Sequence, residues 1–111
     1  MTTKKEIEKA DELFSYLEKE TPNQMASFGK MMHSIEQDGK LSSKVKEAVA
    51  LGIAIKAQCP GCIAFHVKKA IQLGYNKEEI LEIAWVAVLM GDGPSLIYMS
   101  YVKEALEEFA E

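Results

Sequence analysis

The segment from Ile80 to Met90 is apolar on nearly every side of a helix, and it constrains the fold more than any other part of the chain. Asn76, followed three residues later by Glu79, is typical of a helix start, and the run from Asp92 to Pro94 is typical of a break. One domain of 111 residues cannot easily cover such a helix on all sides. The sequence therefore predicts a helix that is shared between a domain core and an interface between subunits.

Short turn signals divide the rest of the chain into further helix-length segments, and none of them has the strict apolar–polar alternation of a strand. Thr21 and Gln24, for example, are spaced as in a capping box around Pro22. The predicted helices are Thr3 to about Lys19, Pro22 to about Glu36, Ser42 or Ser43 to about Ala57, Cys59 or Pro60 to Gly74, Asn76 to about Met90, and Pro94 to about Phe109. The chain is therefore predicted to be all-α, a bundle of about six helices that forms a single domain over residues 1–111 and assembles into oligomers.

The charge balance argues against two classes of partner. The net charge is −4, whereas proteins bind nucleic acids and anionic membranes through basic patches. The amino-terminal residues are polar, and the longest apolar run, from Ile83 to Met90, is far shorter than the roughly 20 residues that span a bilayer. We expect a cytoplasmic protein with no nucleic-acid partner and no membrane partner.

The chain has two cysteines, and they lie three residues apart as Cys59 and Cys62. A disulfide between them would close a very small loop and stabilise the fold little. Redox or metal chemistry therefore explains the pair better than a structural disulfide does. A structural zinc site needs four ligands, and the chain would have to add Glu47 or His33 to reach that number. The remaining interpretation is a pair of small buried apolar side chains.

His66 continues the spacing of the cysteines, because Cys59, Cys62 and His66 lie at i, i+3 and i+7. At 100° per residue these side chains project within about 60° of one another on one helix face. A helix N-terminus and a neighbouring imidazole both favour a reactive thiolate, and a second cysteine in reach can condense with a sulfenic acid to form a disulfide. An antiparallel pair of third and fourth helices would bring Glu47 near His66, where its carboxylate would orient the ring. The alternative for His66 is a histidine of the core without a catalytic role. The alternative for Glu47 is a surface carboxylate paired with Lys44 or Lys46.

These residues together resemble the signature of a known family. The pattern is Glu47-x11-Cys59-x2-Cys62-x3-His66, followed by Gly74 and Glu78-Glu79-Ile80, with Leu51-x-Ile53-Ala54 before the cysteines and Gly93-Pro94 before the last helix. It is similar to the alkylhydroperoxidase D-like branch of the carboxymuconolactone decarboxylase superfamily, over a signature region of about 41–101. One departure is the Pro60-Gly61 pair, where some members place a histidine between the cysteines.

The resemblance implies an all-α fold, self-association as trimers or hexamers, and an antioxidant, peroxiredoxin-type activity that reduces hydroperoxides through a redox-active disulfide. It implies that Glu47 and His66 relay a proton, that Cys62 attacks the peroxide and that Cys59 resolves. The helix-dipole argument favours Cys59 as the more acidic thiol instead. No cofactor or metal is required, because the cysteines perform the chemistry. An external dithiol, thioredoxin-like or lipoyl, would restore the reduced form.

Three alternative functions fit the same sequence. The first is a general thiol–disulfide oxidoreductase. The second is a decarboxylase of a carboxylated lactone, although the decarboxylases of the superfamily generally lack the cysteine pair. The third is a non-enzymatic helical assembly module that senses redox state.

Trp85 is expected to be a buried residue of the core or of a subunit interface.

Overall fold

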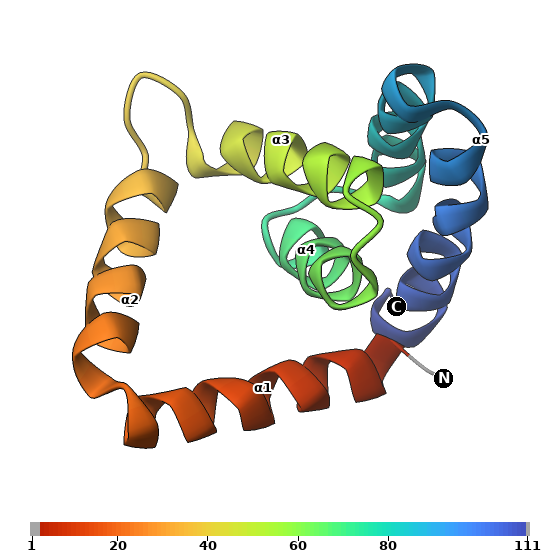
Figure 1. Ribbon diagram of the computed structural model, residues 1–111. Helices are drawn as coiled ribbons and strands as arrows, with labels where there is room; N and C mark the ends of the chain where they lie inside the picture. The colour runs from red at the N-terminus through yellow and green to blue at the C-terminus, as the bar shows by residue number, and fades with distance from the viewer. Residues whose placement is uncertain (1–2, 111) are drawn as a thin grey trace.

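Helices account for nearly all of residues 3–110, which are the residues that the computed structural model describes (Figure 1). This part of the chain contains five helices and no strand, so the predicted all-α class is confirmed. The helices are α1 (Thr3–Glu20), α2 (Pro22–Glu36), α3 (Ser43–Lys56), α4 (Pro60–Gln72) and α5 (Lys77–Phe109).

The core lies where α3, α4 and α5 meet, which Figure 1 shows as the densely packed side of the molecule. Each of these helices contributes an apolar stripe at helical spacing, and burial of such stripes is the main favourable term in folding. The largest fully buried apolar side chains are Leu51, Ile55, Ile63, Val67, Ile80 and Val102. α4 is therefore held on two sides, by α3 and by α5.

α5 contains the break that the sequence predicts, but the structure has five helices where the sequence predicts about six. The predicted fifth and sixth helices are the two halves of α5, which continue through Asp92 with φ 56° and ψ −145°. Pro94, which lacks an N–H and restricts the backbone before it, opens the second half. Because only one residue leaves the helical conformation, the chain bends without an intervening loop.

The predicted starts of α2, α3 and α5 are confirmed, but the predicted side-chain cap forms at α3 and α5 and not at α2. Asn76 and Glu79 form a complete capping box, and Ser42 Oγ accepts a hydrogen bond from the Val45 N–H at 3.1 Å. Thr21 does not cap α2, because its hydroxyl donates to the Leu17 carbonyl at 2.9 Å and thus closes the end of α1.

The first two helices form an arm that contributes little to the core. Thr3 is the buried residue of α1, and α2 has no buried residue at all. Figure 1 shows α1 along one edge and α2 along the next, so this α1–α2 arm frames the other helices rather than covering them. Its exposed large apolar side chains are Leu13, Phe14, Tyr16, Phe28, Met31 and Ile35.

A second exposed apolar surface lies on α3 and α5. Val49, Ile53, Val86 and Met90 line a groove between these two helices. The two helices also expose Val45, Trp85, Leu89, Leu96 and Ile97. Trp85 is 55% exposed, so its placement in the core of one chain is wrong. Its neighbours Ala84 and Ala87 face the core, and the rotation of the helix therefore directs Trp85 outward.

By length and composition alone, α5 is the one helix of the described part that could cross a membrane. This is weak evidence, because the core helix of a soluble protein passes the same test. Both halves of α5 contribute fully buried side chains to the core, Ile80 in the first and Val102 in the second. The helix also bends at Asp92. We therefore describe α5 as a core helix.

The close approach at the bend of α5 gives a stability prediction. A Cβ atom at Gly91 would lie 1.9 Å from Ser95 Oγ and 2.7 Å from Lys56 Cδ, so Gly91→Ala must displace both side chains. We expect the free energy of unfolding to fall by about 1–3 kcal/mol, as in other overpacked sites. Urea denaturation followed by circular dichroism measures this change.

Gly29→Ala is the matched control, because a Cβ at this helical position would meet no atom within 4 Å. It is expected to stabilise α2 by about 0.5–1 kcal/mol through the higher helix propensity of alanine. Equal effects of the two substitutions would contradict the packing described at the bend.

Candidate functional site

The two cysteines lie at the start of α4, where the chain turns out of α3. Their sulfurs form a disulfide. Cys59 is the N-cap residue, and its Sγ accepts a hydrogen bond from the Cys62 N–H at 3.3 Å. Pro60 occupies the first turn, where a missing N–H has no cost. The turn itself depends on Gln58, which adopts a left-handed conformation with φ 57°.

The cysteines differ in accessibility. Cys62 is exposed, whereas Cys59 is half-buried, so a small molecule reaches Cys62 more easily. The interpretation of the pair as small buried apolar side chains is therefore wrong. Cys62 lies one helical turn before His66, although the described residues show no direct hydrogen bond between the two while the sulfurs are paired with each other.

The structure brings Glu47 and His66 together, as the sequence predicts. Glu47 Oε2 lies 2.5 Å from His66 Nδ1. In Figure 1, α4 is seen nearly end-on beside α3, so the helices cross and are not the antiparallel pair expected from the sequence. With Glu47 ionised, Nδ1 carries the proton, and Nε2 is left as the nitrogen that can accept a proton.

Glu47 is buried, with 3% of its side chain exposed, so the interpretation as a surface carboxylate is wrong. Neither of the two lysines proposed as its partners pairs with it. Lys44 lies over the ring of Tyr75, and Lys46 donates to the Ile35 and Gln37 carbonyls, both at 2.7 Å. A carboxylate removed from water needs other partners, because its desolvation is costly.

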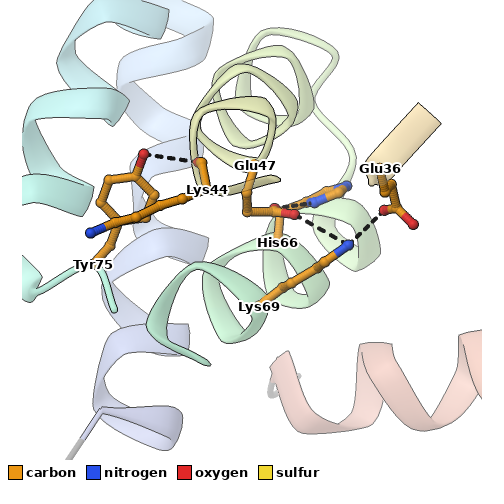
Figure 2. Close-up of polar contacts among 6 residues, drawn as sticks. All are labelled: Glu36, Lys44, Glu47, His66, Lys69 and Tyr75. Atoms are coloured by element: carbon orange, nitrogen blue, oxygen red, sulfur yellow. Dashed lines mark hydrogen bonds and ion pairs between the residues drawn. The ribbon is translucent and has the colours of Figure 1, made fainter. Parts of the chain in front are cut away.

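Lys69 supplies the second partner of Glu47, and Figure 2 shows it between two carboxylates. Its Nζ lies 3.6 Å from Glu47 Oε1 and 2.6 Å from Glu36 Oε2. Sequence reasoning missed both Lys69 and Glu36. Lys69 could have been predicted from the helical spacing, because it lies three residues after His66 on the same face of α4. Glu36 gave no such signal, since it comes from the end of α2.

His33, the other candidate for a metal ligand, is exposed on α2. Among residues 3–110, no three histidine, cysteine, aspartate or glutamate side chains lie close enough together to hold a metal ion. The structure shows two separate contacts on α4, a thiol pair joined as a disulfide at its start and, one turn further on, an imidazole bonded to a buried carboxylate. Such groups are suited to proton transfer and thiol chemistry.

The sequence model of the carboxymuconolactone decarboxylase family matches residues 20–104 of the chain, which is more than half of its length. The chain belongs to the carboxymuconolactone decarboxylase family. Among solved structures, it is similar to a member of this family from Legionella pneumophila, crystallised in the apo form, with a TM-score of 0.93 and 37% sequence identity over 98% of this chain and 97% of that one.

A second solved member of the carboxymuconolactone decarboxylase family comes from Thermotoga maritima and has a suggested part in the antioxidative response. The TM-score is 0.81, with 27% identity over 94% of this chain and 88% of that one. An uncharacterized protein of Cupriavidus necator is 31% identical over 90% of each chain. Uncharacterized protein 4 in the cox locus of Paracoccus denitrificans is 37% identical over 64% of each chain.

The pairing of Glu47 predicts a stability effect in this family member. Glu47→Gln keeps the size of the side chain but removes the charge that pairs with His66 and Lys69. We expect the free energy of unfolding at pH 7 to fall by about 1.5–3 kcal/mol, the range for a hydrogen bond to a charged group. Urea denaturation measures it.

Glu12→Gln is the control, because Glu12 is exposed on α1 and its loss should change stability by less than about 0.5 kcal/mol. A Glu47→Gln protein as stable as this control would show that the buried carboxylate is not a significant interaction in the fold.

Proposed function

We propose that the protein is a hydroperoxide-reducing enzyme of the alkylhydroperoxidase D-like branch, which cycles Cys59 and Cys62 between dithiol and disulfide. The observation that carries the proposal is the disulfide at the start of α4, one turn before a histidine that is bonded to a buried carboxylate. Family membership and the suggested antioxidative part of the Thermotoga maritima protein support it.

In the proposed cycle Cys62 attacks, because it is exposed and lies nearer to His66 along α4. His66 Nε2 accepts the thiol proton, directly or through water, while Glu47 stabilises the charged ring. The thiolate attacks the outer oxygen of the hydroperoxide, the O–O bond breaks, and the departing alkoxide takes a proton to give an alcohol. Cys62 is left as a sulfenic acid.

Cys59 completes the proposed cycle. Its thiolate attacks the sulfenic sulfur, the S–O bond breaks, and the released hydroxide takes a proton to become water. The hydrogen bond from the Cys62 N–H to Cys59 Sγ favours the thiolate form needed for this step. The two electrons lost by the dithiol have then reduced the peroxide, and an external dithiol, thioredoxin-like or lipoyl, must restore the pair. We place this cycle in the cytoplasm, with no cofactor.

The direct test is oxidation of the two thiols by an organic hydroperoxide. One equivalent added to the reduced protein should remove two free thiols per chain, counted over time with a thiol-specific dye. His66→Ala should lower the rate constant by at least about 100-fold, the smaller end of general acid–base contributions. His33→Ala is the matched control, because the exposed His33 is the other histidine of the chain and should leave the rate unchanged.

Cys59→Ser should trap a sulfenic acid on Cys62, whereas Cys62→Ser should react slowly. Thiols that react no faster than free cysteine would rule out the peroxidase. Reduction of disulfides without reduction of peroxides would favour the general oxidoreductase, and lactone decarboxylation that survives loss of both cysteines would favour the decarboxylase. Disulfide formation without turnover would favour the redox-sensing module.

We also propose that the protein works as a homo-oligomer, a trimer or hexamer. The exposed apolar surface of α3 and α5 supports this, because it continues into a groove of about 540 Å³ lined almost entirely by apolar side chains. Ile53 is 63% exposed, Val86 61% and Met90 70%, and contiguous apolar surface of this kind marks interfaces.

Light scattering on the size-exclusion peak should give a mass that is a multiple of the chain mass. Val86→Lys together with Leu89→Lys should reduce that mass, because each lysine would have to be desolvated in the interface. Gln72→Lys, an exposed polar position on α4, is the control and should leave the mass unchanged. A monomeric wild-type protein would contradict the proposal.

A further inference from the structure

We propose that Lys69 is a positioning residue of the site: it holds the Glu47 carboxylate in the orientation that bonds His66, and through Glu36 it makes that orientation depend on α2. The proposal rests on the proposed function for its catalytic consequence. Its physical basis is the contact sequence His66–Glu47–Lys69–Glu36, which crosses three helices and is drawn in Figure 2.

The two carboxylate oxygens of Glu47 have different partners. Oε2 lies against His66 Nδ1, and Oε1 is left facing Lys69 Nζ at 3.6 Å. At 3% exposure the Glu47 side chain is shielded from bulk solvent, so a charged protein partner for this second oxygen stabilises the carboxylate. Without the ammonium, the carboxylate would have one compensated oxygen and would be free to turn about its last bond. Lys69 therefore acts on His66 through Glu47 rather than by contact.

Lys69 is held in turn by a carboxylate of α2. Its shorter bond goes to Glu36 at 2.6 Å, and Glu36 is the last residue of α2. The flexible lysine stem would otherwise carry its ammonium into solvent, because 26% of the side chain is exposed. Glu36 thus fixes Lys69, and Lys69 fixes Glu47.

The end of α2 is joined to the site by polar contacts. Apolar packing holds α2 weakly, because none of its residues is fully buried and a pocket of about 230 Å³ lies between its end and the site. The contacts that tie this end to the site are polar: Lys46 Nζ bonds the Ile35 and Gln37 carbonyls, and Lys69 bonds Glu36. A displacement of α2 would therefore be transmitted to Glu47 through Lys69.

The test compares the rate constants of hydroperoxide-dependent thiol oxidation and the ring-nitrogen NMR signals of His66. Lys69→Met should lower the rate constant about tenfold, the smaller loss seen when an outer partner of a functional histidine is removed. It should also move the His66 signals toward those of Glu47→Gln. Lys69→Arg, which keeps the charge, should restore the rate to within about twofold of wild type. Glu36→Gln should fall between these two.

Lys103→Met is the matched control, because it removes an exposed lysine–glutamate pair of 3.2 Å on α5. Urea denaturation of every variant separates a loss of folded protein from a loss of rate. The proposal is overturned if Lys69→Met keeps the wild-type rate and His66 signals, or if it loses only stability. If Lys69→Met fails to fold, a Glu36→Gln protein with wild-type rate and signals overturns it instead.

Failure of the proposed function gives a different result. In that case the wild-type thiols do not react with hydroperoxide, and no variant changes the rate. The His66 signals then still decide the positioning role, because they report the bond to Glu47 whatever the reaction. A shift in Lys69→Met that Lys69→Arg reverses would support it.

Discussion

The buried carboxylate of Glu47 is the constraint on which the site depends. It belongs to α3, but both of its partners belong to α4, where they lie three residues apart on one face. Because a desolvated charge must be paired, this face of α4 has to turn toward α3. The same face carries Cys62 one turn earlier, so the pairing of one carboxylate fixes the rotation of α4 and with it the direction in which the thiol pair points.

Information that lies within one helix was predictable from the sequence. The spacing of Cys59, Cys62 and His66 depends only on the helical repeat, and the capping box of Asn76 and Glu79 depends only on neighbouring residues. The helical class followed from the same local patterns. The contact of Glu47 with His66 needed a further inference, that the third and fourth helices pack together and bring the only acidic residue of α3 near the histidine.

Features that depend on tertiary arrangement were not predictable in this way. Lys69 and Glu36 are 33 residues apart, and their bond exists only because α2 returns to the site. The Thr21 hydroxyl could either accept an N–H at the start of α2 or donate to a carbonyl at the end of α1. The structure has the second bond, to the Leu17 carbonyl. The count of helices differed because one left-handed residue, Asp92, bends α5 where a loop was expected. Trp85 belongs to a segment that is apolar on nearly every side, so the sequence did not show which of its side chains face solvent.

Cys59 Sγ is both half of the disulfide and the cap of α4, and in the proposed cycle these two properties are thermodynamically linked. A thiolate accepts a hydrogen bond from an N–H about twice as strongly as a neutral acceptor does. α4 therefore gains more from its cap when Cys59 is reduced and ionised, and the same free energy favours the reduced protein. Each 1.4 kcal/mol or so of this difference raises the reduction potential by about 30 mV. In the proposed cycle, the hydrogen bond in the first turn of α4 would therefore make the disulfide a stronger oxidant than a pair that lacks this bond.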